Sequence, residues 1–475
     1  MAGHVQDYTP SLYRLCMRST AVIAIAGLSV LAATTPALGA WGAPERASRA
    51  GEPAHSPDVA VNATGDAAAA WVAGPRLRER IVVSVRPAGR TWGAPQVISG
   101  NARRAIDPQV VLDASGRVLV VWRQAVRTRT VKVRGVARRQ VVYVVRTRDK
   151  KVTDVTWGPA TILSSDRQKV GRPEVGIDED GDAVAAWHWG TGTPPTERGY
   201  VGQVQESERM QDGSWTIARR ISAAPQCRSV DDPRVSVGAR GHTVIWWRCD
   251  LGAGRSTAMS VSRGPGETFG AERELPFRSA GPVSADLDVS ASGRAVAVSA
   301  GTGGTLDWWR GDVGTVLALS GLPSLGAGER IDTGTGPPAI AVNGTGDALS
   351  AWVDRIGRPR AASVASGLGV SAPVTLAAPA RDPHDARVAV GDARRGVMAW
   401  VAGGRVVASS RGLDGAVTAG TPISGRGVPS MAAPAVAMDP PGSAVVFWTR
   451  IVKGVPVVER TTAPPSLTSR PADNG

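Results

Sequence analysis

The segment PDVAVNATGDAAAAW, from Pro57 to Trp71, decides the fold because variants of it recur along the chain. Two examples are PQVVLDASGRVLVVW, from Pro108, and PEVGIDEDGDAVAAW, from Pro173. The repeat units begin near positions 57, 108, 173, 233, 285, 338, 386 and 434. The unit near 285 keeps the turn glycine but has Ser299 where the others end in tryptophan. Self-similarity at a fixed period is typical of an array of stacked structural repeats.

Each unit contains signals for four strands. An alternating V-x-V run precedes Asn62, and Gly65 follows three positions later, which suits a tight turn between two antiparallel strands. A third strand is indicated from Ile81 and a fourth from Trp92, with almost no helical periodicity. The pattern predicts an all-β propeller of about eight four-stranded blades, with seven as the other count. A pair of smaller domains is the alternative architecture.

The two ends of the repeat array complement each other. The last unit has only three strand signals, which end before Thr461, while the segment WGAPERAS from Trp41 is a spare fourth strand. We expect residues 41–48 to complete the last blade and close the ring, because closure removes exposed strand edges. The propeller is therefore predicted over 41–463, followed by a disordered tail over 464–475.

The N-terminal segment predicts export. Arg14 and Arg18 precede the apolar run AVIAIAGLSVLAA, which is followed by small residues, and this order is typical of a secretory signal peptide over 1–40. The apolar run is too short to span a bilayer, and no later segment is long enough. We expect a secreted or cell-wall-associated monomer with no membrane span once the signal is removed.

Two cysteines remain after the predicted signal, Cys227 and Cys249. They flank the hairpin that starts at Pro233, on opposite arms. Because export favours oxidation, the sequence predicts a disulfide between them.

The repeat units resemble those of secreted bacterial propellers built on P-x-V-A-V-[DN]-x-x-G-[DN]-A-x-A-x-W. They are more distantly similar to sialidase-like propellers, whose Asp-box S-x-D-x-G-x-T-W joins the third and fourth strands. Here Gly89, Thr91 and Trp92 match that box, but Pro87 stands in place of its aspartate. The resemblance implies a fold, not an activity.

A sialidase-like activity would require an arginine cluster, a tyrosine nucleophile with a carboxylate partner, and an acid. Tyr143 lies in an insertion and Tyr200 in a loop, and no such constellation can be assembled from the sequence. No catalytic residue is assigned. A glycan-active hydrolase is the alternative to a non-catalytic protein.

The loops between fourth and first strands and those between second and third strands share one face of a propeller. They carry polar residues that do not repeat, so this face is the predicted ligand site; solvated loop charges are the alternative. The candidate ligand-binding residues are Arg104, Asp107, Arg172, Asp232, Arg381, Asp382 and His384.

A basic insertion, RTRTVKVRGVARRQVVYVVRTRDKK from Arg127, alternates apolar and cationic residues, which predicts a hairpin. Its candidate binding residues are Lys132, Arg134, Arg138 and Arg139. The formal net charge of +14 fits an anionic partner or an arginine-rich proteome. Teichoic acid, acidic polysaccharide and extracellular nucleic acid are candidate ligands, and a merely solvated ribbon is the alternative.

Cofactors are not expected. Asp178, Asp180 and Asp182 could converge on calcium, but Asp178 also occupies the repeated turn position. The histidines lack paired spacing for zinc. The aligned tryptophans suit packing between blades better than sugar stacking. The sequence therefore favours a secreted, non-catalytic binding or scaffold propeller, with an anionic glycan or cell-wall polymer as its candidate ligand.

Overall fold

The computed structural model describes residues 41–464 except 101–102, 134–135, 168, 192–200, 224, 280–283, 301–305, 315–316, 322–336, 366–368, 392–394, 413–414 and 430–431. The chain divides into two compact units, residues 1–35 and 36–475, and the described residues all belong to the larger one. The predicted signal peptide and residues 465–475 of the predicted tail lie outside the described residues.

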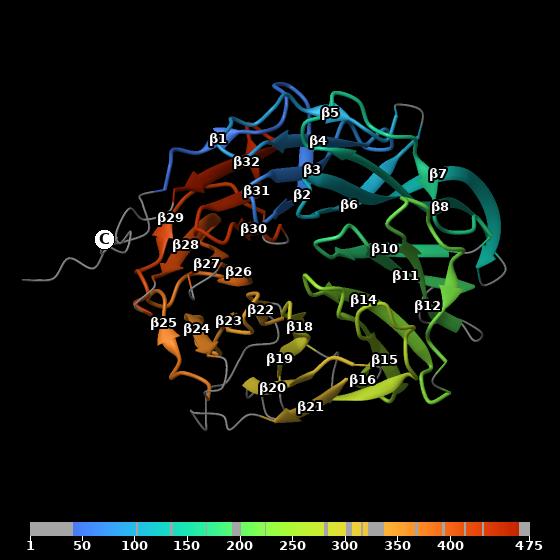
Figure 1. The fold of residues 1–475 in the computed structure, drawn as a ribbon. Coiled ribbons are helices and arrows are strands. Elements are labelled where there is room, and N and C mark those ends of the chain that lie inside the picture. The colour runs from blue at the N-terminus through green and yellow to red at the C-terminus, as the bar shows by residue number, and fades with distance from the viewer. Residues whose placement is uncertain are drawn as a thin grey trace, which may run out of the picture. The chain divides into compact units, whose positions relative to one another are not determined.

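The larger unit is an all-β propeller of eight four-stranded antiparallel blades, and the described residues contain no helix (Figure 1). Blade 1 consists of β2 (Ala54–Val61), β3 (Ala67–Ala73), β4 (Arg80–Arg86) and β5 (Gln96–Val97). Blade 2 consists of β6 (Ala105–Leu112), β7 (Arg117–Val133), β8 (Val136–Lys151) and β9 (Thr161–Ile162). Blade 3 consists of β10 (Lys169–Ile177), β11 (Ala183–Thr191), β12 (Val201–Arg209) and β13 (Arg219–Arg220). Blade 4 consists of β14 (Ser229–Val237), β15 (Thr243–Gly252), β16 (Arg255–Arg263) and β17 (Arg273–Ser279).

The second half of the ring follows the same plan. Blade 5 consists of β18 (Ala285–Val289), β19 (Arg294–Ala300), β20 (Leu306–Asp312) and β21 (Ala318–Gly321). Blade 6 consists of β22 (Ala339–Val342), β23 (Ala348–Val353), β24 (Pro359–Val364) and β25 (Val374–Thr375). Blade 7 consists of β26 (His384–Val390), β27 (Gly396–Ala402), β28 (Arg405–Arg411) and β29 (Thr421–Pro422). Blade 8 consists of β30 (Ala435–Met438), β31 (Ala444–Val452), β32 (Val455–Ala463) and β1 (Glu45–Arg46).

The first strand of every blade lies innermost, around the axis of the ring (Figure 1). The turn that follows it is held by one side chain. Asn62 Oδ1 accepts hydrogen bonds from the backbone N–H groups of Thr64 (3.1 Å) and Asp66 (2.9 Å), and Gly65 takes a φ of 89° that favours glycine. Asn62 Nδ2 also donates to the Asp113 carbonyl of the next blade at 2.9 Å. The repeated turn therefore joins neighbouring blades as well as neighbouring strands.

The repeated tryptophans form the core between blades, which confirms the packing interpretation. They are almost fully buried and comprise Trp71, Trp122, Trp187, Trp247, Trp352, Trp400 and Trp448. Trp122 of blade 2, for example, packs in one cluster with Val83 and Ile98 of blade 1. In blade 5, the indole of Trp309 donates to Ser299 Oγ at 3.0 Å, so a tryptophan from the third strand lies beside the residue that replaces the repeated one.

The N-terminal segment completes the last blade, as predicted. Glu45 and Arg46 of β1 pair with Arg460 and Glu459 of β32. Ser48 Oγ accepts the Val458 N–H at 3.2 Å. Blade 8 thus takes three strands from the end of the described chain and one from its beginning, and blade 1 packs against its first two strands, β30 and β31.

The predicted disulfide between Cys227 and Cys249 is present, with Cα atoms 5.2 Å apart. Cys249 is buried on β15 and packs with Trp247 and Val230. The bond ties the segment before β14 to the second strand of the same blade. Among the described residues, no helix is long and apolar enough to cross a membrane.

Candidate binding pocket at the mouth of the central channel

The innermost strands are irregular where they begin. The antiparallel register of the first strand breaks in five blades, between His55 and Asp58 in blade 1 and at the equivalent place in blades 2, 3, 4 and 7. In four of them the residue before the repeat has a left-handed backbone. These residues are Ser56, Asp107, Asp232 and Asp385, with φ between 52° and 55°. Bulges of this kind re-aim side chains, and left-handed residues other than glycine often mark functional sites.

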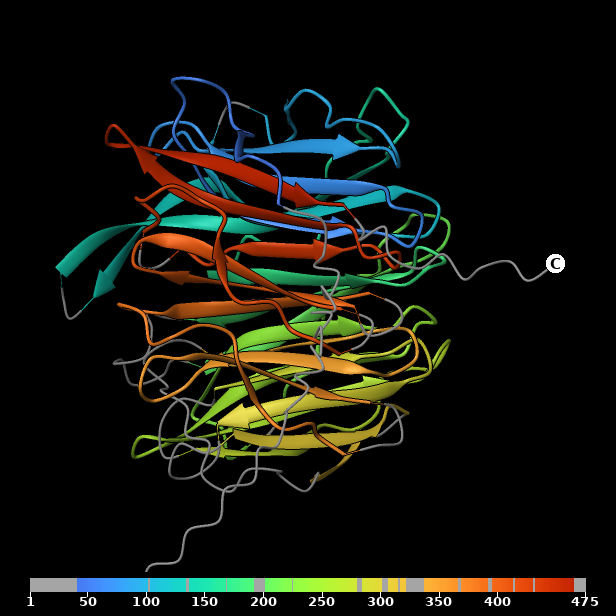
Figure 2. The same cartoon turned by 90° about the vertical axis from the view of Figure 1, so that its left-hand side faces the viewer.

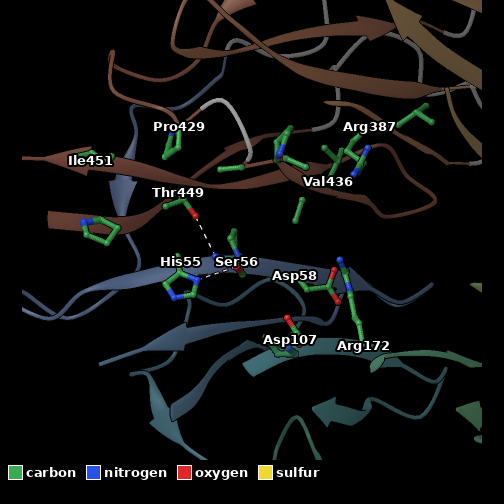
Figure 3. A pocket seen from close by; sticks show the side chains of 18 residues that line it. His55, Ser56, Asp58, Asp107, Arg172, Arg387, Pro429, Val436, Thr449 and Ile451 are labelled. Atoms are coloured by element: carbon green, nitrogen blue, oxygen red, sulfur yellow. Dashed lines mark hydrogen bonds between the residues drawn. The ribbon is translucent and has the colours of Figure 1, made fainter. Parts of the chain in front are cut away.

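A pocket of about 610 Å³ opens over these bulges (Figure 3). Its walls come from the first strands of blades 1, 2, 3, 7 and 8, and from the loop before β30 and the hairpin between β31 and β32. The polar groups lining it are His55, Ser56, Asp58, Asp107, Arg172, Arg387 and Thr449. Proline rings and aliphatic groups complete the walls, among them Pro57, Pro108, Pro429, Val436 and Ile451. A mainly apolar wall with a few convergent polar groups is typical of a small-molecule site.

Blade 8 gives the pocket its room. At the positions where other blades carry polar or charged bulge residues, blade 8 has Ala432 and Ala433, followed by Pro434 and Ala435. These short side chains leave space beside the bulge of blade 1. The pocket is therefore off the axis of the ring, toward blade 8.

The Asp58 carboxylate lines the pocket and has a raised pKa. Its Oδ2 accepts the Val110 N–H of the neighbouring inner strand at 2.8 Å. Burial raises the pKa of Asp58 to about 6, while that hydrogen bond and the charge of Arg172 act in the opposite direction. Figure 3 shows Asp58 and Arg172 side by side. Asp58 thus changes charge in a pH range where most carboxylates are already ionised.

Two guanidinium groups balance the carboxylates. Arg172 is 57% exposed at its side chain and its Nε lies 3.4 Å from Glu174 Oε1. Arg387 donates to the Ala386 carbonyl at 2.8 Å. Burial lowers the pKa of Arg387, but an arginine remains charged throughout the physiological range. The pocket therefore presents fixed positive charge on two sides.

His55 and Ser56 add neutral hydrogen-bonding groups. His55 Nδ1 lies 2.9 Å from Ser56 Oγ, and the Ser56 N–H donates to Thr449 Oγ1 of blade 8 at 3.2 Å. Burial lowers the pKa of His55, which favours the neutral form of its ring. This pair can donate to and accept from hydroxyl groups.

The residues predicted from the sequence fall into two groups. Asp107 and Arg172 line the pocket, and Arg123 holds the Asp107 carboxylate. Asp232 and His384 are not part of its lining. Asp232 pairs with Arg234 at 3.3 Å, and His384 Nδ1 lies 2.8 Å from Asp385 Oδ2.

The predicted residues Arg104, Arg381 and Asp382 also lie outside the pocket wall. Arg381 and Asp382 pair with each other at 3.5 Å and are 90% and 81% exposed. Arg104 forms an ion pair with Glu79 (3.1 Å), and its Nη1 donates a hydrogen bond to the Tyr143 hydroxyl (3.1 Å), between blades 1 and 2.

The basic insertion forms the predicted hairpin, as a direct extension of β7 and β8 rather than a separate element. Arg138 and Arg139 are exposed on it. Arg134 and the side chain of Lys132 lie outside the described residues. In the DEDGD turn, Asp178 Oδ1 accepts the N–H groups of Asp180 (3.1 Å) and Asp182 (2.9 Å), so this carboxylate is used in the turn. No group of three or more acidic, histidine or cysteine side chains in the described part of the chain is placed to hold a metal.

Sequence reasoning missed His55, Ser56, Asp58 and Arg387. A signal was available for the last two, because the second position of the repeat is charged in several units. It holds Asp58, Glu174, Arg234, Asp286 and Arg387, although the residue before it is proline or alanine and the residue after it is valine or leucine. A charged residue in an otherwise apolar inner strand indicates that the strand faces a polar cavity.

The chain matches no protein-family model and no curated protein. Among solved structures, the BP39L lectin of Burkholderia pseudomallei aligns with a TM-score of 0.51 and 13% identity, covering 78% of this chain and 99% of the lectin. A Hadza microbial sialidase, Hz136, aligns with a TM-score of 0.42 and 13% identity, covering 84% and 77% of the two chains. These likenesses concern the fold alone.

Proposed function

We propose that this protein is a non-catalytic carbohydrate-binding propeller whose ligand occupies the pocket over the bulges of blades 1, 2 and 3. The observation that carries the proposal is the composition of that pocket. Carboxylates, guanidinium groups and hydroxyls converge on a hollow walled by proline rings. Sugars present hydroxyls that both donate and accept hydrogen bonds, beside apolar ring faces, and this pocket offers partners for both.

The charge of the pocket favours a glycan that carries an acidic group. Arg172 is more than half exposed, and its ion pair with Glu174 at 3.4 Å leaves guanidinium N–H groups for a ligand. Arg387 faces the same space (Figure 3). A guanidinium binds a carboxylate or sulfate through two parallel hydrogen bonds. The lectin whose fold resembles this chain supports carbohydrate binding as the general class.

Binding without turnover is favoured because the carboxylates of the pocket already have partners. Asp58 accepts a backbone N–H of the adjacent blade, and Arg123 holds Asp107. Glycoside hydrolysis commonly needs two carboxyl groups free to act on opposite sides of one bond. These two carboxylates instead hold the walls of the site in place.

A hydrolase is the second candidate, and one observation favours it. The Tyr143 hydroxyl contacts Arg104, which also pairs with buried Glu79, and the Arg123 guanidinium lies over the Tyr143 ring at 5.2 Å. A tyrosine between two arginines is suited to act near an anionic sugar. Release of fluorophore from a panel of fluorogenic glycosides, abolished by Tyr143→Phe, would establish this role and replace the binding-only proposal.

We also propose a location outside the cytoplasm. The Cys227–Cys249 bond supports it, since disulfides persist in oxidising compartments. The predicted signal peptide over 1–40 supports it independently. Intact mass and N-terminal sequence of protein recovered from the host's medium or wall would test both.

The binding proposal is tested with the chain from Trp41 onward on an array of neutral and acidic glycans, followed by titration of the strongest binder. Arg172→Gln should weaken that binder about tenfold or more, because a charge-assisted contact is lost. Arg381→Gln is the matched control, since Arg381 is on the same face but outside the pocket wall. Equal affinities for both variants, or no binder on the array, would count against the pocket.

A further inference from the structure

The hairpin of blade 2 extends far beyond its blade. The pairing of β7 with β8 begins at Arg117 and Lys151 and continues to Val133 and Val136, with a register break between Ala125 and Arg127. Figure 2 shows the teal hairpin projecting from one side of the propeller. We call residues 127–142 the basic hairpin. It emerges from the face that carries the second-to-third-strand loops and therefore the pocket described above.

A second hollow, of about 340 Å³, lies at the foot of the basic hairpin. It is lined by Ser99 and Gly100 of blade 1 and by Arg103, Gln124, Ala125, Val126 and Arg146. Gln124 is already engaged, because its amide donates to the Arg103 carbonyl at 2.8 Å and its oxygen accepts the Trp122 indole N–H at 3.0 Å. The charged groups of this hollow are two guanidinium groups, on Arg103 and Arg146.

Arg146 is unlike its neighbour on the same strand. Arg148 donates from Nε to the Gly158 carbonyl (2.8 Å) and from Nη1 to the Ile98 carbonyl (2.9 Å). The Nε of Arg146 is buried and has no hydrogen-bond partner among the described residues. A buried donor without an acceptor is costly, and Arg146 lines the hollow, so an anionic ligand bound there would supply the missing acceptor.

Further cations continue from the hollow along the hairpin. Arg127 and Arg129 donate to the Asp166 (3.2 Å) and Arg167 (3.1 Å) carbonyls, which fixes the hairpin against the loop before β10. Arg138 and Arg139 are exposed nearer the tip. Among the described residues of the hairpin and the hollow, one ion pair is present, between Arg127 and Asp166 at 3.3 Å. The surface therefore keeps a row of largely uncompensated positive charge.

We propose that this hollow binds an anionic group of an acidic polysaccharide, with Arg103 and Arg146 as its ligands, and that the basic hairpin binds the following acidic groups of the same chain. A sulfate or carboxylate suits a hollow lined by two guanidinium groups, because each of its oxygens accepts charge-assisted hydrogen bonds from such groups. A polysaccharide is favoured over single-stranded nucleic acid, whose bases stack on aromatic side chains. The exposed large hydrophobic side chains of the described hairpin are Val136 and Val141, neither of them aromatic, and the Arg123 guanidinium lies over the Tyr143 ring.

The experiment measures retention on immobilised heparin and titration with heparin at low and physiological salt. Arg103→Gln with Arg146→Gln should weaken binding at least about tenfold at low salt, and the remaining affinity should fall less steeply with salt. The control carries Arg90→Gln and Arg381→Gln, which remove the same charge from exposed sites elsewhere. Arg103→Gln alone is a second test, because Arg103 is exposed and its loss should not disturb folding.

Equal loss in the test and control variants would overturn the site, since only net charge would then matter. Tighter binding of duplex or single-stranded DNA than of heparin, with the same dependence on Arg103, would overturn the polysaccharide assignment.

Arg172→Gln should leave heparin retention unchanged. A glycan-array failure combined with retained heparin binding would thus reject the pocket alone, and the reverse result would reject the hairpin site alone.

Discussion

The two ends of the innermost strands differ in how much their residues vary. At the end that leads into the second strand, Asn62 and Asp439 occupy equivalent positions in blades 1 and 8, and each accepts backbone N–H groups of its own turn. At the other end, the equivalent residues Ser56, Asp107 and Arg172 share position but not chemistry. The regular end serves the fold, which needs the same turn in every blade. The irregular end is free to vary and carries the candidate site.

This comparison predicts that changes at repeated or closing positions affect stability, while changes at the bulged end affect binding. The largest effect should come from deleting residues 41–48. The deletion removes β1 and leaves β32 as an open edge, with a loss of about 4 kcal/mol or more from burial and ladder hydrogen bonds. Thermal melting and size-exclusion chromatography should show a large drop in Tm and aggregation. Removal of residues 465–475 is the control, and equal Tm values for both truncations would show that β1 does not close the ring.

The second largest effect is a difference in unfolding free energy between a substitution at a repeated core position and one at the bulged end. Trp187→Ala should cost about 3–5 kcal/mol of unfolding free energy, because the side chain is fully buried between blades. Arg172→Ala should change that free energy by less than about 0.5 kcal/mol, since its side chain is largely exposed. Denaturant unfolding of both variants measures the two values. A cost for Arg172→Ala that equals that of Trp187→Ala would remove the distinction between the two ends.

The smallest effect is the pH dependence of the pocket. Burial raises the pKa of Asp58 from 3.8 to about 6, so its carboxyl is mostly neutral at pH 5 and mostly ionised at pH 7. An acidic glycan should bind several-fold more tightly at pH 5, because the repulsion from Asp58 is lost while Arg172 stays charged.

Asp58→Asn should flatten most of this dependence in a titration series from pH 5 to 7.5. The same pKa fixes the sign for stability. A carboxyl whose pKa is raised by folding favours the folded state most when it is neutral. The contribution of Asp58 to the free energy of unfolding is therefore complete below pH 3.8 and is lost as the pH rises through about 6. An unchanged pH profile in the Asn variant would mean that Asp58 does not face the ligand.

Much of the fold could be predicted from the sequence because propeller repeats make it explicit. Trp71 and its equivalents, together with Gly65 and its equivalents, set the spacing of the blades. Closure by residues 41–48 was also predictable, since the last unit lacked a strand. The Cys227–Cys249 pair followed from two cysteines on opposite arms of one hairpin.

The pocket could be predicted only in part. Asp107 and Arg172 stand out as charged residues next to a repeat proline. The sequence does not show that they line the same pocket, because that pocket forms where the small residues of blade 8 lie beside blades 7, 1 and 2. The bulges could not be predicted from the sequence either. Ser56 precedes a proline and has a positive φ, but nothing in the sequence around it indicates that backbone conformation. The sequence does not distinguish Arg146 from Arg148, since both are cations of one alternating strand. Only the structure shows that Arg148 donates to backbone carbonyls while the Nε of Arg146 has no hydrogen-bond partner among the described residues.

The most direct test of the account is a crystal structure of the protein with the acidic glycan that binds most strongly on the array. We predict ligand density in the pocket of about 610 Å³, with an acidic group within hydrogen-bonding distance of Arg172. Density in another hollow, such as the one lined by Trp41 and Thr421 at the closing strand, with the first pocket free of ligand, would contradict it.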